Sequence, residues 1–140
     1  MNYFAYGSNM NHVQMKTRCP GSRFITKVFL DGYKFVYDGY TTIRNGAVAN
    51  VIPSIGEIVW GGLFEINQDN LFALDCYEGY PTIYQRKELE VKDDNGKRYQ
   101  AIVYLRNKKQ IGKPSSEYRN LIIQGARDCE LPDKYINDVL

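Results

Sequence analysis

Branched and aromatic residues dominate long stretches of the chain, which predicts a protein rich in β-structure. The stretches expected to form strands are 3–6, 24–30, 34–37, 47–52, 58–66, 88–92 and 99–105. Asp31-Gly32 and residues 53–56 are interpreted as turns between strands, and Asp93-Asp94-Asn95-Gly96 as a hairpin turn. Several short strands and few helices indicate a mixed, strongly curved sheet or barrel.

Three segments are expected to be helical. The first covers residues 10–18 and ends at a Cys-Pro-Gly breaker. The second begins after Asn67, a favourable N-cap, and stops at Gly79, a favourable C-terminal residue. The third begins after Ser115 or the serine that follows it, and Leu131-Pro132 breaks it before a final turn.

Size and charge narrow the class of protein. The chain has 140 residues without a linker-like stretch, so a single domain over residues 1–140 is expected. A net charge of +2 is too small to indicate binding to nucleic acid or to an anionic membrane. No window approaches the ~20 apolar residues of a transmembrane helix, and the N-terminus lacks the features of a signal peptide.

Most standard catalytic and metal sites are excluded by the residues available. His12 is the only histidine, so neither a His-based triad nor a His-rich metal site can form. The cysteines at 19, 76 and 129 are odd in number and widely spaced, which gives no metal-ligand pair and favours a reducing cytoplasm. Phosphate-binding glycine motifs are absent as well. We therefore expect no metal and no cofactor.

One candidate segment is Tyr6-Gly7-Ser8-Asn9, between the first predicted strand and the first predicted helix. Glycine lets the backbone approach a ligand closely, and successive N–H groups at a helix start suit an anion or an oxyanion. Gly-Ser-Asn is also ordinary turn chemistry. These residues alone leave both interpretations open.

The other candidate is the end of the second predicted helix. One face of that helix carries two apolar and two acidic side chains: Leu71, Leu74, Asp75 and Glu78. Burial, the helix end and Asp75 are all expected to raise the pKa of Glu78 toward the range of a general base. The alternative is an exposed glutamate at a fraying helix end.

These two segments, together with several others in the same order, resemble the gamma-glutamylcyclotransferase family. The matching residues are Tyr3-Phe4-Ala5-Tyr6-Gly7-Ser8-Asn9, Val59-Trp60-Gly61, Leu74-Asp75, Glu78-Gly79, Tyr84, Tyr118, Ile122-Ile123, Gly125-Ala126, Leu131-Pro132 and Tyr135. A Tyr-Gly-Ser-Asn start with a later Asp-x-x-Glu-Gly is a specific combination, and the matches cover nearly the whole chain. Met10 stands where leucine is commoner, and residues 80–83 differ from those of the glutathione-pathway enzymes.

The resemblance implies an α+β fold, a small mixed β-barrel with peripheral helices. It also implies an enzyme that cyclises a γ-glutamyl compound and releases 5-oxoproline and a free amine. The implied catalytic acid–base residue is Glu78. The implied substrate-binding residues are Tyr6, Gly7, Ser8, Asn9, Tyr84 and Tyr118.

The identity of the substrate stays open at this stage. The compound cleaved is a γ-glutamyl amino acid, a γ-glutamylamine or a γ-glutamylated biosynthetic intermediate. The alternative from another class is a non-catalytic ligand-binding or interaction protein that retains the pocket, and Glu78 beside an intact loop favours catalysis over it. Neither nucleic acid nor a membrane is expected as a partner, and the oligomeric state is undefined, with a homodimer among the alternatives.

Overall fold

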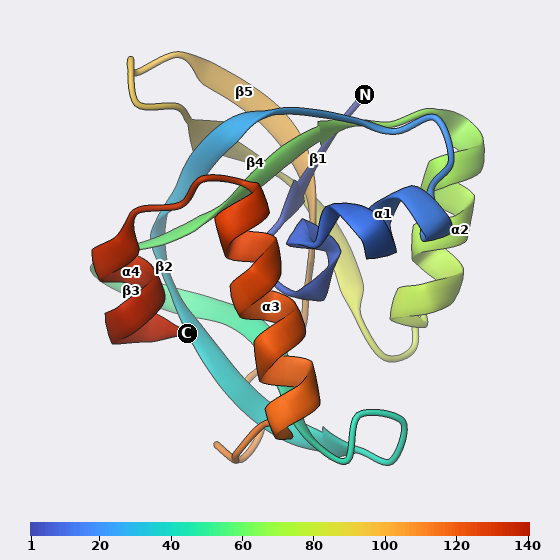
Figure 1. The fold of residues 1–140 in the computed structure, drawn as a ribbon, viewed down its shortest axis with the longest axis vertical. Helices are drawn as coiled ribbons and strands as arrows, with labels where there is room; N and C mark the ends of the chain where they lie inside the picture. Colours follow the sequence, from blue (N-terminus) through green and yellow to red (C-terminus); the bar gives the residue numbers. More distant parts are fainter.

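Five strands close into a barrel with the helices packed around its outside (Figure 1). The structure is a computed structural model that describes residues 1–140. The strands are β1 (Asn2–Ala5), β2 (Arg23–Thr41), β3 (Gly46–Glu65), β4 (Gln85–Lys92) and β5 (Arg98–Leu105). Around the barrel they follow the order β1-β3-β2-β4-β5. Because β1 runs parallel to β5 and the other pairs are antiparallel, the predicted mixed barrel with peripheral helices is confirmed.

Two of the predicted turns do not reverse the chain. Residues 24–30 and 34–37 belong to one strand, β2, and residues 47–52 and 58–66 belong to one strand, β3. The pairing register shifts between them, so that Gly32 alone on β2 lies opposite residues 54–57 on β3. The prediction of separate strands was wrong because glycine and polar residues mark a bulge as readily as a turn. The bulge bends both long strands around the barrel.

The three predicted helices begin and end close to the predicted positions, and the structure has two further helices, one 3₁₀ helix and one at the C-terminal end. The helices are the 3₁₀ helix η1 (Ser8–Met10) and the α-helices α1 (His12–Arg18), α2 (Gln68–Glu78), α3 (Ser116–Asp128) and α4 (Asp133–Val139). Asn67 caps α2, its side chain accepting a hydrogen bond from the Asn70 amide at 2.8 Å. Gly79 ends α2 in the left-handed conformation, at φ 66°. Of the two candidate serines, Ser115 caps α3.

Apolar side chains fill the barrel and pack between the barrel and the helices on its outside. The largest fully buried ones include Phe4, Leu63 and Val103 from the strands, and Ile122 from α3. Leu74 is fully buried and anchors α2, as its place on the predicted apolar face requires. None of the helices combines the length and apolar composition needed to cross a bilayer.

Helix α3 packs very closely on the turn that carries η1, and the contact occurs at Gly125. A Cβ atom at this position would lie 2.4 Å from the Asn11 amide nitrogen and 2.6 Å from the Met10 carbonyl carbon. Both are backbone atoms, so neither can move aside by rotating a side chain. The absence of a side chain at Gly125 therefore sets how closely α3 approaches the residues just after the 6–9 loop.

We predict that Gly125→Ala destabilises the protein by about 1–3 kcal/mol, the usual cost of overpacking a close contact. In an open helix the same change would stabilise by about 0.5–1 kcal/mol. The contact with Met10 and Asn11 therefore decides the sign. The measurement is urea unfolding, with Asn120→Ala on an exposed position of the same helix as the control. A gain in stability for Gly125→Ala would contradict the packing described.

Candidate functional site

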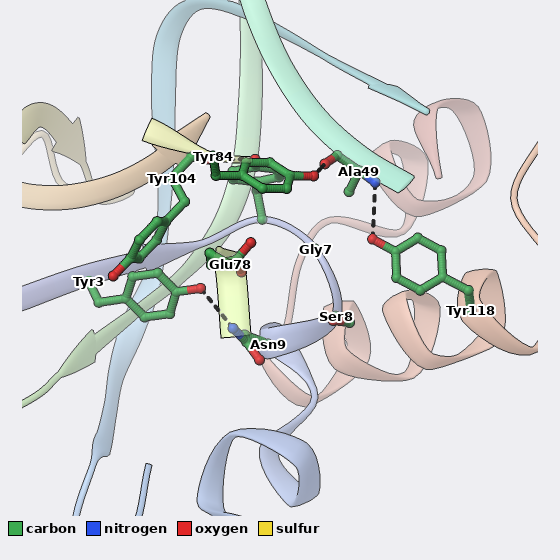
Figure 2. Close-up of a pocket in the computed structure, with 10 residues that line it drawn as sticks. Tyr3, Gly7, Ser8, Asn9, Ala49, Glu78, Tyr84, Tyr104 and Tyr118 are labelled. Carbon is green, nitrogen blue, oxygen red and sulfur yellow. Dashed lines mark hydrogen bonds between the residues drawn. The ribbon is translucent and has the colours of Figure 1, made fainter. Parts of the chain in front are cut away.

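A pocket opens beside the end of α2, between the 6–9 loop and the first turn of α3 (Figure 2). Half of its lining residues are tyrosines, which combine an aromatic ring with a polar hydroxyl group. Five of the 12 tyrosines in the chain line the pocket. The lining residues are Tyr3, Tyr6, Gly7, Ser8, Asn9, Ala49, Glu78, Tyr84, Tyr104 and Tyr118. Glu78 is the only acidic side chain among them.

The structure brings all seven predicted site residues to this one pocket. These are Tyr6, Gly7, Ser8, Asn9, Glu78, Tyr84 and Tyr118. Sequence reasoning missed three further lining residues, Tyr3, Ala49 and Tyr104. Tyr3 lay within the quoted family motif without an assigned role, whereas Tyr104 and Ala49 lie in ordinary strand patterns that carry no signal of a site.

Glu78 is the last residue of α2, and its carboxyl group points into the pocket (Figure 2). It is half-buried and forms no hydrogen bond or ion pair within the chain. Burial raises the pKa of Glu78 to about 7, and the guanidinium groups of Arg18, Arg44 and Arg106 partly oppose that rise. A carboxyl group with this pKa can both accept and donate a proton near neutral pH.

Asp75, one turn before Glu78, forms its polar contacts with residues other than Glu78. Its carboxylate accepts a hydrogen bond from the Tyr104 hydroxyl at 2.6 Å and pairs with Arg86. The expectation that Asp75 raises the pKa of Glu78 is not met, because burial is the cause of the rise and Asp75 does not contribute. Asp75 instead fixes the orientation of Tyr104 in the pocket wall.

The 6–9 loop is held in place by hydrogen bonds to side chains of β1 and α1. Asn9 donates to the Tyr3 hydroxyl at 3.0 Å. Gln14 on α1 donates to the hydroxyl of Ser8 at 2.8 Å and to the amide oxygen of Asn9 at 2.9 Å. These contacts use side chains and leave the Gly7 amide without a hydrogen-bond partner in the chain.

Gly7 lies tightly against the opposite wall of the pocket. A Cβ atom at Gly7 would be 3.2 Å from the Cβ of Ala49 and 4.0 Å from the hydroxyl oxygen of Tyr118. A larger side chain would therefore narrow the space beside the free amide. The close approach expected of this glycine from the sequence is present.

Ala49 on β3 holds two tyrosine hydroxyls through its backbone (Figure 2). The Tyr84 hydroxyl donates to the Ala49 carbonyl at 2.7 Å, and the Tyr118 hydroxyl accepts from the Ala49 amide at 3.0 Å. Tyr6 donates to the Tyr104 carbonyl at 2.6 Å. Burial raises the pKa of Tyr118 to about 12 and that of the others further, so these hydroxyls stay protonated at neutral pH.

The direction of each hydrogen bond decides what the tyrosines offer a ligand. Tyr6 and Tyr84 donate their protons to carbonyl groups, so their oxygen lone pairs face the pocket as acceptors. Tyr118 and Tyr3 accept from N–H groups, so each keeps its proton free to donate. Together with Glu78, the pocket presents both acceptors for a cation and donors for an anion.

Guanidinium groups surround the pocket from outside its wall. Arg106 forms a buried ion pair with Asp38 at 2.6 Å, and its Cζ lies 4.9 Å from the centre of the Tyr84 ring. Arg44 lies over Tyr118 at 5.1 Å. Sequence reasoning missed these arginines because they come from turns and strand ends where charged residues are ordinary.

Comparison with known proteins shows similarity over nearly the whole chain. The AIG2-like family matches residues 58–139. The gamma-glutamylcyclotransferase of Homo sapiens is 32% identical over 138 residues, which cover 95% of this chain and 73% of that protein. The Mus musculus protein of the same name is 30% identical with the same coverage. A solved structure of a gamma-glutamyl cyclotransferase superposes with a TM-score of 0.93 at 28% identity, covering 100% of this chain and 88% of that one.

The raised pKa of Glu78 predicts a pH-dependent effect of Glu78→Gln on stability. Between its ordinary value of 4.5 and about 7, the folded protein holds the proton more tightly than the unfolded chain does. The stability due to Glu78 is therefore lost as the pH rises through this range. Glu78→Gln should then be more stable than the parent protein at pH 8, by on the order of 1–3 kcal/mol.

Urea unfolding at pH 8 and at pH 4.5 tests this expectation. Most of the gain from Glu78→Gln should disappear at the lower pH, where Glu78 is protonated in the folded state and already half protonated in the unfolded state. Glu88→Gln, the same substitution at an exposed position of β4, is the control and should show no such difference. A glutamine variant that is less stable than the parent at pH 8 would contradict the burial of an unpaired carboxyl.

Proposed function

Because the chain belongs to the gamma-glutamylcyclotransferase family, we propose that it releases 5-oxoproline from a γ-glutamyl compound with Glu78 as its single acid–base residue. The observation that supports this proposal is the unpaired carboxyl of Glu78 in the pocket, whose pKa burial raises to about 7. A group with that pKa can take up and return one proton within a catalytic cycle.

The reaction needs only one bond formed and one bond broken at the same carbon atom. The α-amine of the substrate attacks its own δ-carbonyl carbon and closes a five-membered lactam, and the bond to the leaving nitrogen then breaks. Nucleophile and electrophile belong to one molecule, so binding in a folded conformation supplies most of the required proximity. Neither water nor an external nucleophile is consumed, and no metal takes part in the proposed mechanism.

Glu78 carries the proton between the two nitrogen atoms. As a carboxylate it accepts a proton from the α-ammonium group, which makes the amine nucleophilic. As a carboxylic acid it then donates that proton to the departing nitrogen, so the bond to the leaving amine can break. The ring nitrogen still carries a second proton after the attack, and Glu78, again a carboxylate, accepts this proton and passes it to the released amine or to solvent, which returns the enzyme to its starting state. The single acidic side chain of the pocket is sufficient for both steps.

The other lining groups suit the γ-glutamyl head, which carries an ammonium and a carboxylate. The lone pairs of Tyr6 and Tyr84 are acceptors for the ammonium group. The free amide of Gly7 and the hydroxyl proton of Tyr118 are donors for the α-carboxylate, or for the oxyanion that forms on the attacked carbonyl. We assign substrate binding to the 6–9 loop, Tyr84 and Tyr118 on these grounds.

A non-catalytic protein that merely binds a γ-glutamyl compound is the competing hypothesis. Binding an amino-acid head does not require a half-buried carboxyl group that has no partner. Such a group lowers stability at neutral pH, so a protein that only binds would gain by replacing it. The raised pKa of Glu78 therefore favours catalysis over binding alone.

We expect the purified protein to form 5-oxoproline from at least one member of a panel of γ-glutamyl dipeptides and γ-glutamylamines. Glu78→Gln should keep the fold and lower kcat by about 10²-fold or more, the usual scale for loss of an acid–base group. Glu88→Gln is the matched control at an exposed position. Near-normal turnover by the Glu78→Gln protein would remove Glu78 from the mechanism.

A further inference from the structure

Two arginine side chains beside the pocket have no acidic partner. Arg86 pairs with Asp75 and Arg106 pairs with Asp38, but Arg18 and Arg44 form no ion pair with any carboxylate of the chain. Both are half-buried rather than fully solvated. An unpaired, partly desolvated guanidinium is costly, and such groups are commonly found where an anionic ligand binds.

Arg44 approaches the wall of the pocket from the turn 42–45 between β2 and β3, which lies near the first turn of α3 in Figure 1. Its Cζ lies 5.1 Å from the centre of the Tyr118 ring, and its Nη2 donates to the side-chain oxygen of Gln14 at 3.3 Å. Gln14 in turn donates to Ser8 in the 6–9 loop. Arg44 is thus fixed against two parts of the pocket lining.

Most of the hydrogen-bonding capacity of Arg44 is unused. A guanidinium group has five N–H donors, and one bond to Gln14 is the only hydrogen bond that the Arg44 side chain makes. Its planar face is occupied by Tyr118, which leaves its edge available. The edge is the part of arginine that binds a carboxylate with two parallel hydrogen bonds.

The local charge is also unbalanced. Arg18 and Arg44 lie close enough for Arg18 to lower the pKa of Arg44, in addition to the effect of burial. Glu78 is the only acidic side chain that lines the pocket beside them, and burial disfavours its charged form. One carboxyl group facing two unpaired guanidinium groups leaves positive charge in excess, which an anionic group on the ligand would neutralise.

Arg44 is not among the residues that line the pocket around the γ-glutamyl head in the proposed function. In the proposed function the head already has the Gly7 amide, the tyrosine hydroxyls and Glu78 around it. Glu78 must reach the leaving nitrogen, so whatever is attached beyond that nitrogen extends from the pocket toward its surroundings. Arg44 lies against the Tyr118 ring on a separate turn, which makes it a candidate contact for this outer part.

We propose that Arg44 determines leaving-group specificity by binding a carboxylate on the leaving amine. This inference rests on the proposed function and adds to it a residue that distinguishes γ-glutamyl amino acids from γ-glutamylamines. A γ-glutamylamine has no carboxylate at this point and would leave the Arg44 edge unpaired. The two classes of compound are distinguished because the Arg44 guanidinium is paired with a carboxylate in one complex and has no partner in the other.

The test compares γ-glutamyl-alanine with γ-glutamylethylamine, two compounds that differ only by the carboxylate of the leaving group. The parent protein should prefer γ-glutamyl-alanine, measured as the ratio of the two kcat/KM values. Arg44→Gln should lower that ratio by about 10- to 100-fold, the scale for loss of a charge-assisted hydrogen bond, with most of the change in KM. Arg44→Lys should lower it less, because the charge remains without the planar fork.

Arg98→Gln serves as the matched control, since it makes the same charge change at an exposed position of the β4–β5 hairpin. It should leave the ratio at the parent value. A ratio unaffected by Arg44→Gln, or a loss that is equal for both compounds, would overturn the proposal, because Arg44 would then act on the shared head or on Glu78.

Failure of the proposed function would give a different result from failure of this inference. If neither these two compounds nor any other member of the panel yields 5-oxoproline, the proposed activity fails, and the subsite is judged from binding alone. For that purpose the two dissociation constants are measured on the Glu78→Gln protein with and without Arg44→Gln. Tighter binding of γ-glutamyl-alanine that is lost with Arg44 supports the subsite, and equal binding of both compounds overturns it.

Discussion

The chemistry of the pocket depends on one electrostatic constraint, a half-buried carboxyl group that has no partner in the chain. Glu78 ends helix α2 inside a pocket whose walls give it neither a hydrogen bond nor an ion pair. Its pKa therefore rises to about 7, and the folded protein bears a cost in stability at neutral pH. The arrangement persists because α2 is anchored independently, by Leu74 in the core and by the Asn67 cap at its other end.

The closed barrel supplies the rigid wall opposite Glu78. Ala49 lies on the long strand β3, and its amide and carbonyl fix the hydroxyl groups of Tyr118 and Tyr84. The close packing of Gly125 against Met10 and Asn11, at the end of η1, holds α3 next to the 6–9 loop. Segments far apart in the sequence thus meet within one small pocket, and each is held there by contacts that do not involve Glu78.

The elements that depend on local chemistry could be predicted from the sequence. The Asn67 cap and the Gly79 stop were found because each acts within one turn of its own helix. Residues 24–37 were divided wrongly, because continued pairing across a bulge depends on the partner strand and not on the residues of the bulge. The family resemblance indicated the predicted lining residues, but Tyr104 lines the pocket and Arg44 packs against Tyr118 only through tertiary contacts that no local pattern encodes.

The most direct test of this account is a titration of Glu78 itself. Carbon-13 NMR of protein labelled at the glutamate side-chain carboxyl carbon follows each ionisation separately, and the Glu78 signal is assigned by its absence in the Glu78→Gln protein. We expect this signal to titrate with a midpoint near pH 7, because burial raises the pKa of Glu78 to about 7. A midpoint between about 4 and 5, as for an exposed glutamate, would contradict the account.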